Sequence, residues 1–292
     1  MPTPTRIKLK NILFATDFSP SAEAILPHAL DVARRYGAVL YTVHVLLHRL
    51  FVEVAQPNPE QIRLMASQRM PALVRSESWK DVKHKELIEQ GEVSEVLSKL
   101  GRKYGIDLIV MGTGGRKGLG KLLLGSVAEE VFRNAECPVL TVGPHVTRWR
   151  TEGKLQHILF ATDFGPESLH GLPYAISLAE KNRALLTILH VAPETGVGLF
   201  LDDPKEVTTS TEKQLRALIP RGTRLWHEPE YRVEFGSPAE TILRVAATTV
   251  DMIVLGVKRA GALTKHLGEG VAYKVVCEAP CRVLSVGARY HA

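Results

Sequence analysis

The chain has 292 residues, a length that predicts about two domains. Hydrophobic residues make up 45% and charged residues 23%, which is typical of a folded protein and wrong for a disordered one. The formal charge is +6, but neither half carries a basic block and aromatic residues are only 6%, so we expect no nucleic-acid partner. Three cysteines exclude a disulfide framework, and the apolar runs are far shorter than the ~20 residues of a membrane span. We therefore expect a soluble cytoplasmic protein with no membrane partner.

Short apolar runs alternate with helix-length segments along the first half. The pattern predicts strands at 12–16, 39–45, a run ending at 86–89, 108–111 and 139–142, and helices at 20–36, 60–79, 93–104 and 126–134. Wholly apolar strands between helices indicate a parallel sheet covered on both faces. In such a sheet, ligands bind beyond the carboxyl ends of the strands, where the strand order reverses.

The second half repeats the first. Asn11–Phe18 recurs as His157–Phe164, Asp107–Gly112 as Asp251–Gly256, and Cys137–Gly143 as Cys281–Gly287. The landmarks keep their order and spacing across the chain, so we predict two copies of one five-stranded α/β domain. We set the N-terminal copy at residues 1–146 and the C-terminal copy at 155–292.

A glycine-rich loop follows the fourth predicted strand. Gly112–Gly125 contains six glycines and runs directly into the helix that begins at Ser126. Glycines let the backbone approach an anion closely, and a helix N-terminus adds N–H donors and a positive dipole end. The loop therefore predicts a phosphate ligand. It is not a P-loop, because Leu122 stands where Ser or Thr would hold Mg²⁺.

The spacing Gly112, Gly115, Gly125, Ser126 resembles the G-x2-G-x9-G-[S/T] pattern of the universal stress protein family. Ile12–Ser19 and Cys137–Leu140 resemble that family's first strand with its turn and its last strand. The resemblance covers nearly the whole chain in two copies. It implies two tandem Rossmann-like domains of the adenine nucleotide alpha hydrolase-like type, and the glycine pattern implies the subset that binds ATP.

Carried over residue by residue, the resemblance implies one adenine-nucleotide site in the N-terminal copy. Ala15 and Val45 would lie beside the adenine, Asp17 would bind the ribose, and Met111 and Gly112 would flank it. The phosphates would be held by backbone N–H groups and one hydroxyl. The complete expected set is Ala15, Thr16, Asp17, Val45, Met111, Gly112, Gly115, Gly125, Ser126 and Val127. The ligand would be ATP, with ADP and AMP left open, and Mg²⁺ could accompany it.

The C-terminal copy departs from this pattern. Arg259, Glu269 and Gly270 stand at the places of Gly115, Gly125 and Ser126, so we expect no phosphate site there. Two readings stay open: Glu269 paired with Arg259 replaces the phosphate internally, or the loop has drifted after losing its ligand.

Other residues carry less chemical signal. We expect His44 to be structural, because His190 repeats it although the second copy has lost the glycine pattern. We expect Cys277 and Cys281 to be buried thiols rather than metal ligands. Ser237 with Glu240 predicts a capping box. No catalytic residue or metal site is predicted.

We therefore expect a nucleotide-dependent stress-response module that is not an enzyme. A slow ATPase and a nucleotide-independent interaction module remain as alternatives. The family resemblance also implies pairing through the last strand. It would join 139–142 to 283–286 as an intramolecular pseudo-dimer, and a homodimer of chains stays open.

Overall fold

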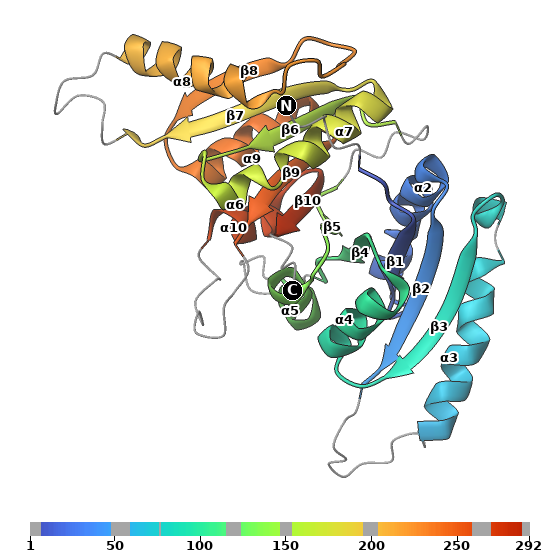
Figure 1. Ribbon diagram of the computed structural model, residues 1–292. Coiled ribbons are helices and arrows are strands. Elements are labelled where there is room, and N and C mark those ends of the chain that lie inside the picture. The colour runs from blue at the N-terminus through green and yellow to red at the C-terminus, as the bar shows by residue number, and fades with distance from the viewer. Residues whose placement is uncertain are drawn as a thin grey trace. The chain divides into compact units, whose positions relative to one another are not determined.

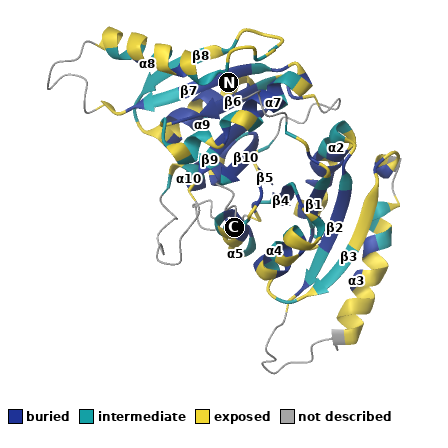
Figure 2. Ribbon diagram, in the orientation of Figure 1, coloured by how far each residue is buried: buried dark blue, intermediate teal, exposed yellow. Residues whose placement is uncertain are grey.

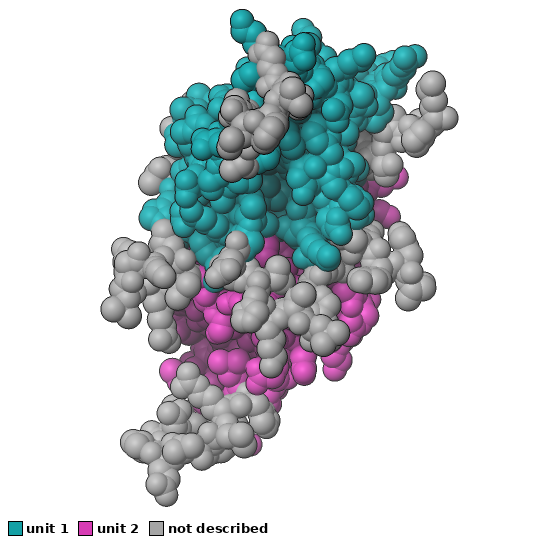
Figure 3. All heavy atoms as spheres, turned by 90° about the vertical axis from the view of Figure 1, so that its left-hand side faces the viewer, with its two compact units in different colours: residues 1–7, 115–123, 141–292 teal, residues 8–114, 124–140 magenta. Residues whose placement is uncertain are grey.

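The computed structural model describes residues 7–47, 59–75, 77–114, 124–146, 154–194, 204–258 and 270–287. These residues form two compact units, coloured separately in Figure 3. Unit 2 contains the described residues of 8–140, and unit 1 contains Ile7 and those of 141–287.

The N-terminal copy alternates strands and helices as predicted (Figure 1). Its strands lie in the order β3-β2-β1-β4-β5, with β1 parallel to both β2 and β4, and β2 parallel to β3. The elements are β1 (Asn11–Ala15), α1 (Pro20–Glu23), α2 (Leu26–Tyr36), β2 (Val39–Leu46), α3 (Pro59–Val74), the 3-10 helix η1 (Glu77–Trp79), β3 (His84–Gln90), α4 (Val93–Tyr104), β4 (Leu108–Gly112), α5 (Ser126–Asn134) and β5 (Val139–Val142).

The C-terminal copy repeats this architecture in the order β8-β7-β6-β9-β10, again with parallel neighbours. Its elements are β6 (His157–Ala161), α6 (Pro166–Leu169), α7 (Leu172–Asn182), β7 (Leu185–Ala192), α8 (Pro204–Leu218), β8 (Glu230–Phe235), α9 (Pro238–Thr249), β9 (Met252–Val257), α10 (Val271–Glu278) and β10 (Arg282–Gly287). The predicted α/β class with helices on both sheet faces is confirmed in both copies.

The central strands form the core of each copy (Figure 2). Ile12, Leu13 and Phe14 of β1 are fully buried, and so are their counterparts Ile158, Leu159 and Phe160 of β6. Consecutive side chains of a strand point to opposite faces, so burial of all three requires cover on both faces. The strand order reverses between β1 and β4 and between β6 and β9. Ligands bind at such reversals in open α/β sheets.

An aspartate ties the amino ends of two strands together in each copy. Asp107 Oδ2 accepts from the backbone N–H groups of Lys10, at 2.7 Å, and Asn11, at 3.0 Å. Asp251 Oδ2 makes the same pair of contacts with the backbones of Gln156 and His157. These carboxylates stabilise the sheet at the end opposite the candidate site.

The predicted helix 20–36 is wrong in one respect, because it is broken into α1 and α2. Pro27 lies in the first turn of α2 and has no N–H to donate to the carbonyl of Glu23, so one helix cannot run through this point. Pro173 stands at the same place in α7. The predicted glycine end is confirmed, since Gly37 caps α2 with φ of 61°.

Two further predictions needed correction. The helix predicted at 60–79 ends at Val74 and is followed by η1. Ser237 is the N-cap of α9, but its side chain makes no capping hydrogen bond, so the capping box does not form. Glu240 instead accepts from Lys274 Nζ at 3.0 Å.

Candidate functional site

The turn after β1 places Asp17 at the carboxyl edge of the sheet. Thr16 Oγ1 accepts from the Phe18 backbone N–H at 3.0 Å, and Asp17 Oδ1 accepts from the Ser19 backbone N–H at 2.9 Å. Phe18 has a positive φ of 57°, which a bulky residue rarely adopts and which the surrounding bonds must hold. The result is an exposed Asp17 carboxylate on a tightly bonded turn.

His44 supports this turn from β2. Its Nδ1 lies 2.9 Å from the Thr16 carbonyl oxygen, and because a carbonyl only accepts, Nδ1 carries the proton and donates. The ring also packs against Phe18, with centroids 4.4 Å apart. The prediction that His44 is structural is confirmed, and His190 makes the same contact with Thr162 in the C-terminal copy.

Arg69 of α3 is a neighbour of this turn that the sequence did not indicate. Its Nη2 donates to the Phe18 carbonyl at 2.9 Å, and its guanidinium lies 5.1 Å from the centroid of the Phe18 ring. An exposed arginine on a predicted helix gives no signal of such a contact. The corresponding helix α8 has Gln214 at this place, so the contact belongs to the N-terminal copy.

The strand ends bring several predicted residues together. Ala15 pairs with Val43 in the β1–β2 register, and Val45 follows on the same strand. Phe14 pairs with Val110, so Met111 and Gly112 continue β4 directly beside Ala15 and Thr16. Met111 is buried, whereas Ala15, Val45 and Gly112 are partly exposed at the edge. The predicted adenine and ribose residues therefore share one edge of the sheet.

The two ends of the glycine loop meet at a narrow neck. The Gly125 N–H donates to the Thr113 carbonyl at 2.8 Å, and Gly114 has a positive φ of 61°. A Cβ added to Gly125 would lie 3.3 Å from the Gly114 carbonyl oxygen, so a larger residue would need the neck to shift by a few tenths of an ångström. The Gly125 N–H is thus already bonded to protein and is not open to a phosphate.

The first turn of α5 remains available as an anion site. Gly125 is its N-cap and has no side chain that could cap the helix. Ser126 is exposed and Val127 partly exposed, and the N–H groups of a first helical turn have no partner within the helix. Gly115, the remaining predicted cradle residue, lies outside the described residues. So do Arg259 and Glu269, so the internal phosphate substitute stays a prediction.

The C-terminal copy keeps the turn but changes its surroundings. Thr162 Oγ1 accepts from the Phe164 N–H at 2.9 Å, and Asp163 Oδ1 accepts from the Gly165 N–H at 2.8 Å. A hydrogen bond from Ser168 holds the pKa of Asp163 below its usual value, against the opposing effect of burial. Ala22 stands at the place of Ser168 in the N-terminal copy, so Asp17 has no equivalent neighbour.

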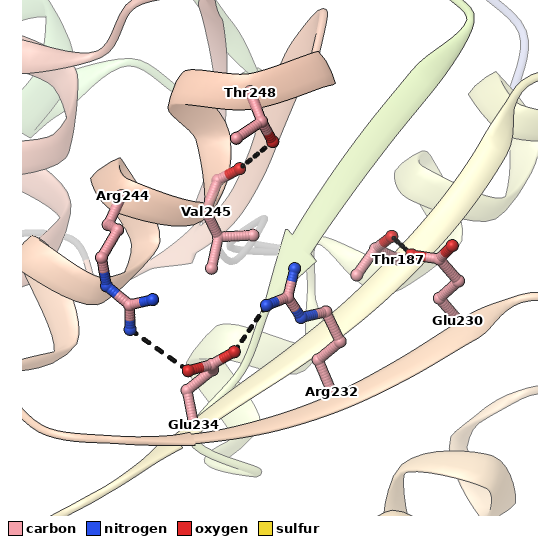
Figure 4. A network of polar contacts seen from close by, with 7 residues as sticks. All are labelled: Thr187, Glu230, Arg232, Glu234, Arg244, Val245 and Thr248. Atoms are coloured by element: carbon pink, nitrogen blue, oxygen red, sulfur yellow. Dashed lines mark hydrogen bonds and ion pairs between the residues drawn. The ribbon is translucent and has the colours of Figure 1, made fainter.

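A second polar cluster, on β7, β8 and α9, has its charges paired internally (Figure 4). Glu234 Oε1 lies 2.5 Å from Arg232 Nη2, and Glu234 Oε2 lies 3.1 Å from Arg244 Nη2. Burial opposes the ionisation of Glu234, but the hydrogen bonds from both arginines outweigh it and lower the pKa. Its charges are satisfied within the fold, so we assign this cluster no ligand.

Several expectations about other chemistry can be compared with the structure. Cys277 and Cys281 are 5% and 2% exposed, which confirms them as buried thiols. Within the described ranges, no cluster of three metal-ligating side chains occurs. No helix in the described part of the chain is long and apolar enough to cross a membrane.

Comparison with known proteins gives consistent matches. The universal stress protein family model matches residues 8–143 and 154–287. A universal stress protein of Methanocaldococcus jannaschii is 37% identical over 139 residues, covering 46% of this chain and 81% of that protein. A universal stress protein A homologue of Coxiella burnetii is 35% identical over 138 residues, covering 46% and 95%. The crystal structure of a universal stress protein from Archaeoglobus fulgidus matches 97% of this chain and 100% of its own, with a TM-score of 0.76 and 20% identity, which supports the fold.

Proposed function

Because the chain belongs to the universal stress protein family, with one family domain in each half, we propose that its N-terminal copy binds an adenine nucleotide. The observation that carries this proposal is the first turn of α5, whose N-cap Gly125 has no side chain to bond its N–H groups and which begins where the Gly114–Gly125 neck closes beside β4. A helix N-terminus with open donors at a strand-order reversal suits a phosphate. The exposed carboxylate of Asp17 on the neighbouring turn suits ribose hydroxyls.

Different residues would contact the base, the ribose and the phosphates of the ligand. Ala15, Thr16 and Val45 would border the base, Asp17 would accept from the ribose, and Met111 and Gly112 would flank the sugar. Backbone donors of Ser126 and Val127, with the Ser126 hydroxyl, would hold the phosphates, and Gly115 would let the loop approach them. ATP is the proposed ligand, and a bound Mg²⁺ would be held by the phosphates rather than by a protein cluster.

We propose a cytoplasmic stress-response module that responds to the nucleotide and does not consume it as an enzyme. A partner would distinguish the nucleotide-bound state from the free state. Measurement of ATP turnover tests this view. Repeated turnover that disappears in Asp17→Ala would contradict it and favour the slow-ATPase alternative.

Calorimetric titration with ATP tests the binding site, and the duplication supplies a matched control. Asn retains the oxygen that accepts from the Ser19 backbone, so Asp17→Asn should keep the turn while weakening ATP binding by tenfold or more, on the order of a lost charge-assisted hydrogen bond. Asp163→Asn makes the same change in the C-terminal copy and should leave ATP binding unchanged.

Gly115→Arg gives the loop the residue that the C-terminal copy carries at this place. It should abolish ATP binding without changing the thermal midpoint of the ligand-free protein. Absence of ATP binding by the unaltered chain would instead favour a nucleotide-independent interaction module.

We also propose that the domains at 1–146 and 155–292 pair through their last strands, as an intramolecular pseudo-dimer. Thr141 of β5 lies in unit 1 with β10, where its Oγ1 donates to the Val283 carbonyl at 3.2 Å. Light scattering on the intact chain should then give the mass of a monomer. A stable dimer would instead favour pairing between two chains.

A further inference from the structure

Arginine and aromatic side chains gather on the C-terminal copy near the starts of β7 and β8. Arg183 is the C-cap of α7, Arg216 lies in the last turn of α8, and the others lie on the connection to β8 or at its start. This is the amino edge of the strands, opposite the edge that carries Asp163. We call the group the arginine–aromatic patch; it comprises Arg183, Arg216, Arg221, Arg224, Trp226 and Tyr231.

Two of its arginines stack on aromatic rings. The Arg183 guanidinium carbon lies 4.0 Å from the centroid of Trp226, and that of Arg216 lies 4.5 Å from the centroid of Tyr231. Trp226 is nevertheless 59% exposed, which is unusual for so large an apolar side chain. A stacked guanidinium still directs its N–H groups outward in the plane of its fork, where they match a carboxylate.

Comparison with the N-terminal copy indicates that stability alone does not explain the patch. Arg183 has a positive φ of 55° at a helix end where the N-terminal copy uses Gly37, at 61°. Glycine adopts this conformation without strain and arginine does not. Gly236 after β8 corresponds to Gly91 after β3. Trp226 precedes Gly236 by as many residues as Asp81 precedes Gly91, so Trp226 stands at the place of Asp81. The C-terminal copy therefore accepts a strained backbone and an exposed indole together.

The four arginines of the patch outnumber the carboxylates of Glu228 and of Glu180, whose Oε1 accepts from the Arg224 backbone N–H at 3.4 Å. Among the described residues, Arg183, Arg221 and Arg224 make no ion pair, and Arg216 has only an exposed contact with Glu228 at 3.9 Å. An exposed pair at this distance contributes little. Arginine, tryptophan and tyrosine are also the residues that dominate the binding energy of protein interfaces. The patch thus combines an apolar anchor with unpaired cations.

We propose that the arginine–aromatic patch binds an acidic segment of a partner protein. Trp226 packs against the segment, and the guanidinium groups of Arg183, Arg221 and Arg224 bind its carboxylates. A nucleic acid fits less well, because binding of a single strand uses successive aromatic rings, and Trp226 is the one ring of the patch that is exposed. The patch shares no residue with the proposed nucleotide site, so either can fail without the other.

Fluorescence anisotropy of a labelled poly-glutamate peptide, titrated with the full chain, tests the proposal. Poly-lysine of equal length and poly-deoxythymidine of equal charge serve as competing probes. Arg183→Gly is the decisive variant, because glycine fits the backbone at this position, as Gly37 does in α2. It should leave the thermal midpoint unchanged or raise it, while weakening poly-glutamate binding by about tenfold. Trp226→Ala should weaken binding similarly.

Arg102→Gln is the control for charge, since Arg102 is an exposed arginine of the N-terminal copy paired with Glu136. It removes one positive charge elsewhere and should change binding less than about twofold, as expected for a charge outside the interface. Three outcomes would overturn the proposal: no binding of poly-glutamate by the unaltered chain, equal losses in Arg102→Gln and Arg183→Gly, or tighter binding of poly-deoxythymidine than of poly-glutamate.

Discussion

His157 has both ring nitrogens engaged at the start of β6. Its Nε2 lies 2.7 Å from Thr187 Oγ1, and its Nδ1 lies 2.9 Å from Thr249 Oγ1. The Thr187 hydroxyl donates its proton to Glu230 at 2.9 Å, so the Thr187 oxygen accepts from the Nε2–H of His157. In the neutral ring Nδ1 then has no proton and accepts from the Thr249 hydroxyl. Burial lowers the pKa of His157 from 6.5, although Glu230 and Asp251 oppose this.

This pKa shift predicts a loss of stability in mild acid. The unfolded chain protonates the histidine at a higher pH than the folded chain does, so the free energy of unfolding falls as the pH drops below about 6.5. Urea denaturation at about pH 7.5 and about pH 5.5 should show this fall. His157→Asn takes the residue that the N-terminal copy has at Asn11, and its pH dependence should be smaller. An equal pH dependence in both proteins would assign the effect to other groups.

The equivalent aspartates Asp107 and Asp251 should differ in how much each stabilises the fold. Asp107 and Asp251 each accept two backbone N–H groups, but Asp251 is only 7% exposed and Asp107 is half-buried. Substitution of Asp107 by Ala should cost about 2 kcal/mol, because charge-assisted bonds are lost and two donors are left open to water. Asp251→Ala should cost more, since its donors lie deeper. Urea denaturation measures both, and a smaller loss for Asp251→Ala would contradict this argument.

At the scale of elements, two glycines of the helices separate the effect of backbone conformation on stability from the effect of packing. A Cβ added to Gly37 would meet nothing within 4 Å, yet the residue has a positive φ. Gly37→Ala should therefore destabilise the protein by about 1 kcal/mol through backbone strain alone. Gly101 has equally open space but lies inside α4, so Gly101→Ala should stabilise by about 0.5–1 kcal/mol. If urea denaturation shows that both variants are stabilised or both are destabilised, packing rather than backbone conformation determines the effect at one of the two glycines.

Most elements could be predicted because their signals are local. The bounds of α4, α5 and β5 match the predicted ranges, since apolar periodicity and flanking turn residues define them. The break between α1 and α2 could have been predicted from Pro27, but the helical spacing of the apolar residues favoured a single helix. The end of α3 gave no comparable signal in the sequence.

For the whole molecule, the duplication made the position of the candidate site partly predictable. Repeated segments located the strand ends, and the family pattern then selected Asp17, Gly125 and Ser126. Contacts between residues distant in the chain were not predictable, such as Arg69 with Phe18 and Arg183 with Trp226. Nothing local marks an exposed arginine as a partner of an aromatic ring, because the pairing depends on how the helices pack on the sheet.

Comparison of the copies predicts which element decides the proposed nucleotide binding. Both turns have the same bonds, with Thr16 and Thr162 each accepting two residues ahead, so the turn alone would give two nucleotides per chain. The loops differ, and a side chain at a cradle glycine would fill space that the phosphates need. We therefore expect one nucleotide per chain by native mass spectrometry.

Transfer of residues 112–127 in place of 256–271 tests this argument directly, because the two segments have equal length. Ser168→Ala should accompany the transfer, since Ser168 lowers the pKa of Asp163 and Ala22 occupies its place in the N-terminal copy. The stoichiometry should rise from one to two nucleotides per chain, and Asp163→Asn in the same background should return it to one. If the transferred loop leaves the stoichiometry at one, the loop does not by itself distinguish the copies. The contact of Arg69 with Phe18, where α8 has Gln214, would then be the next difference to exchange.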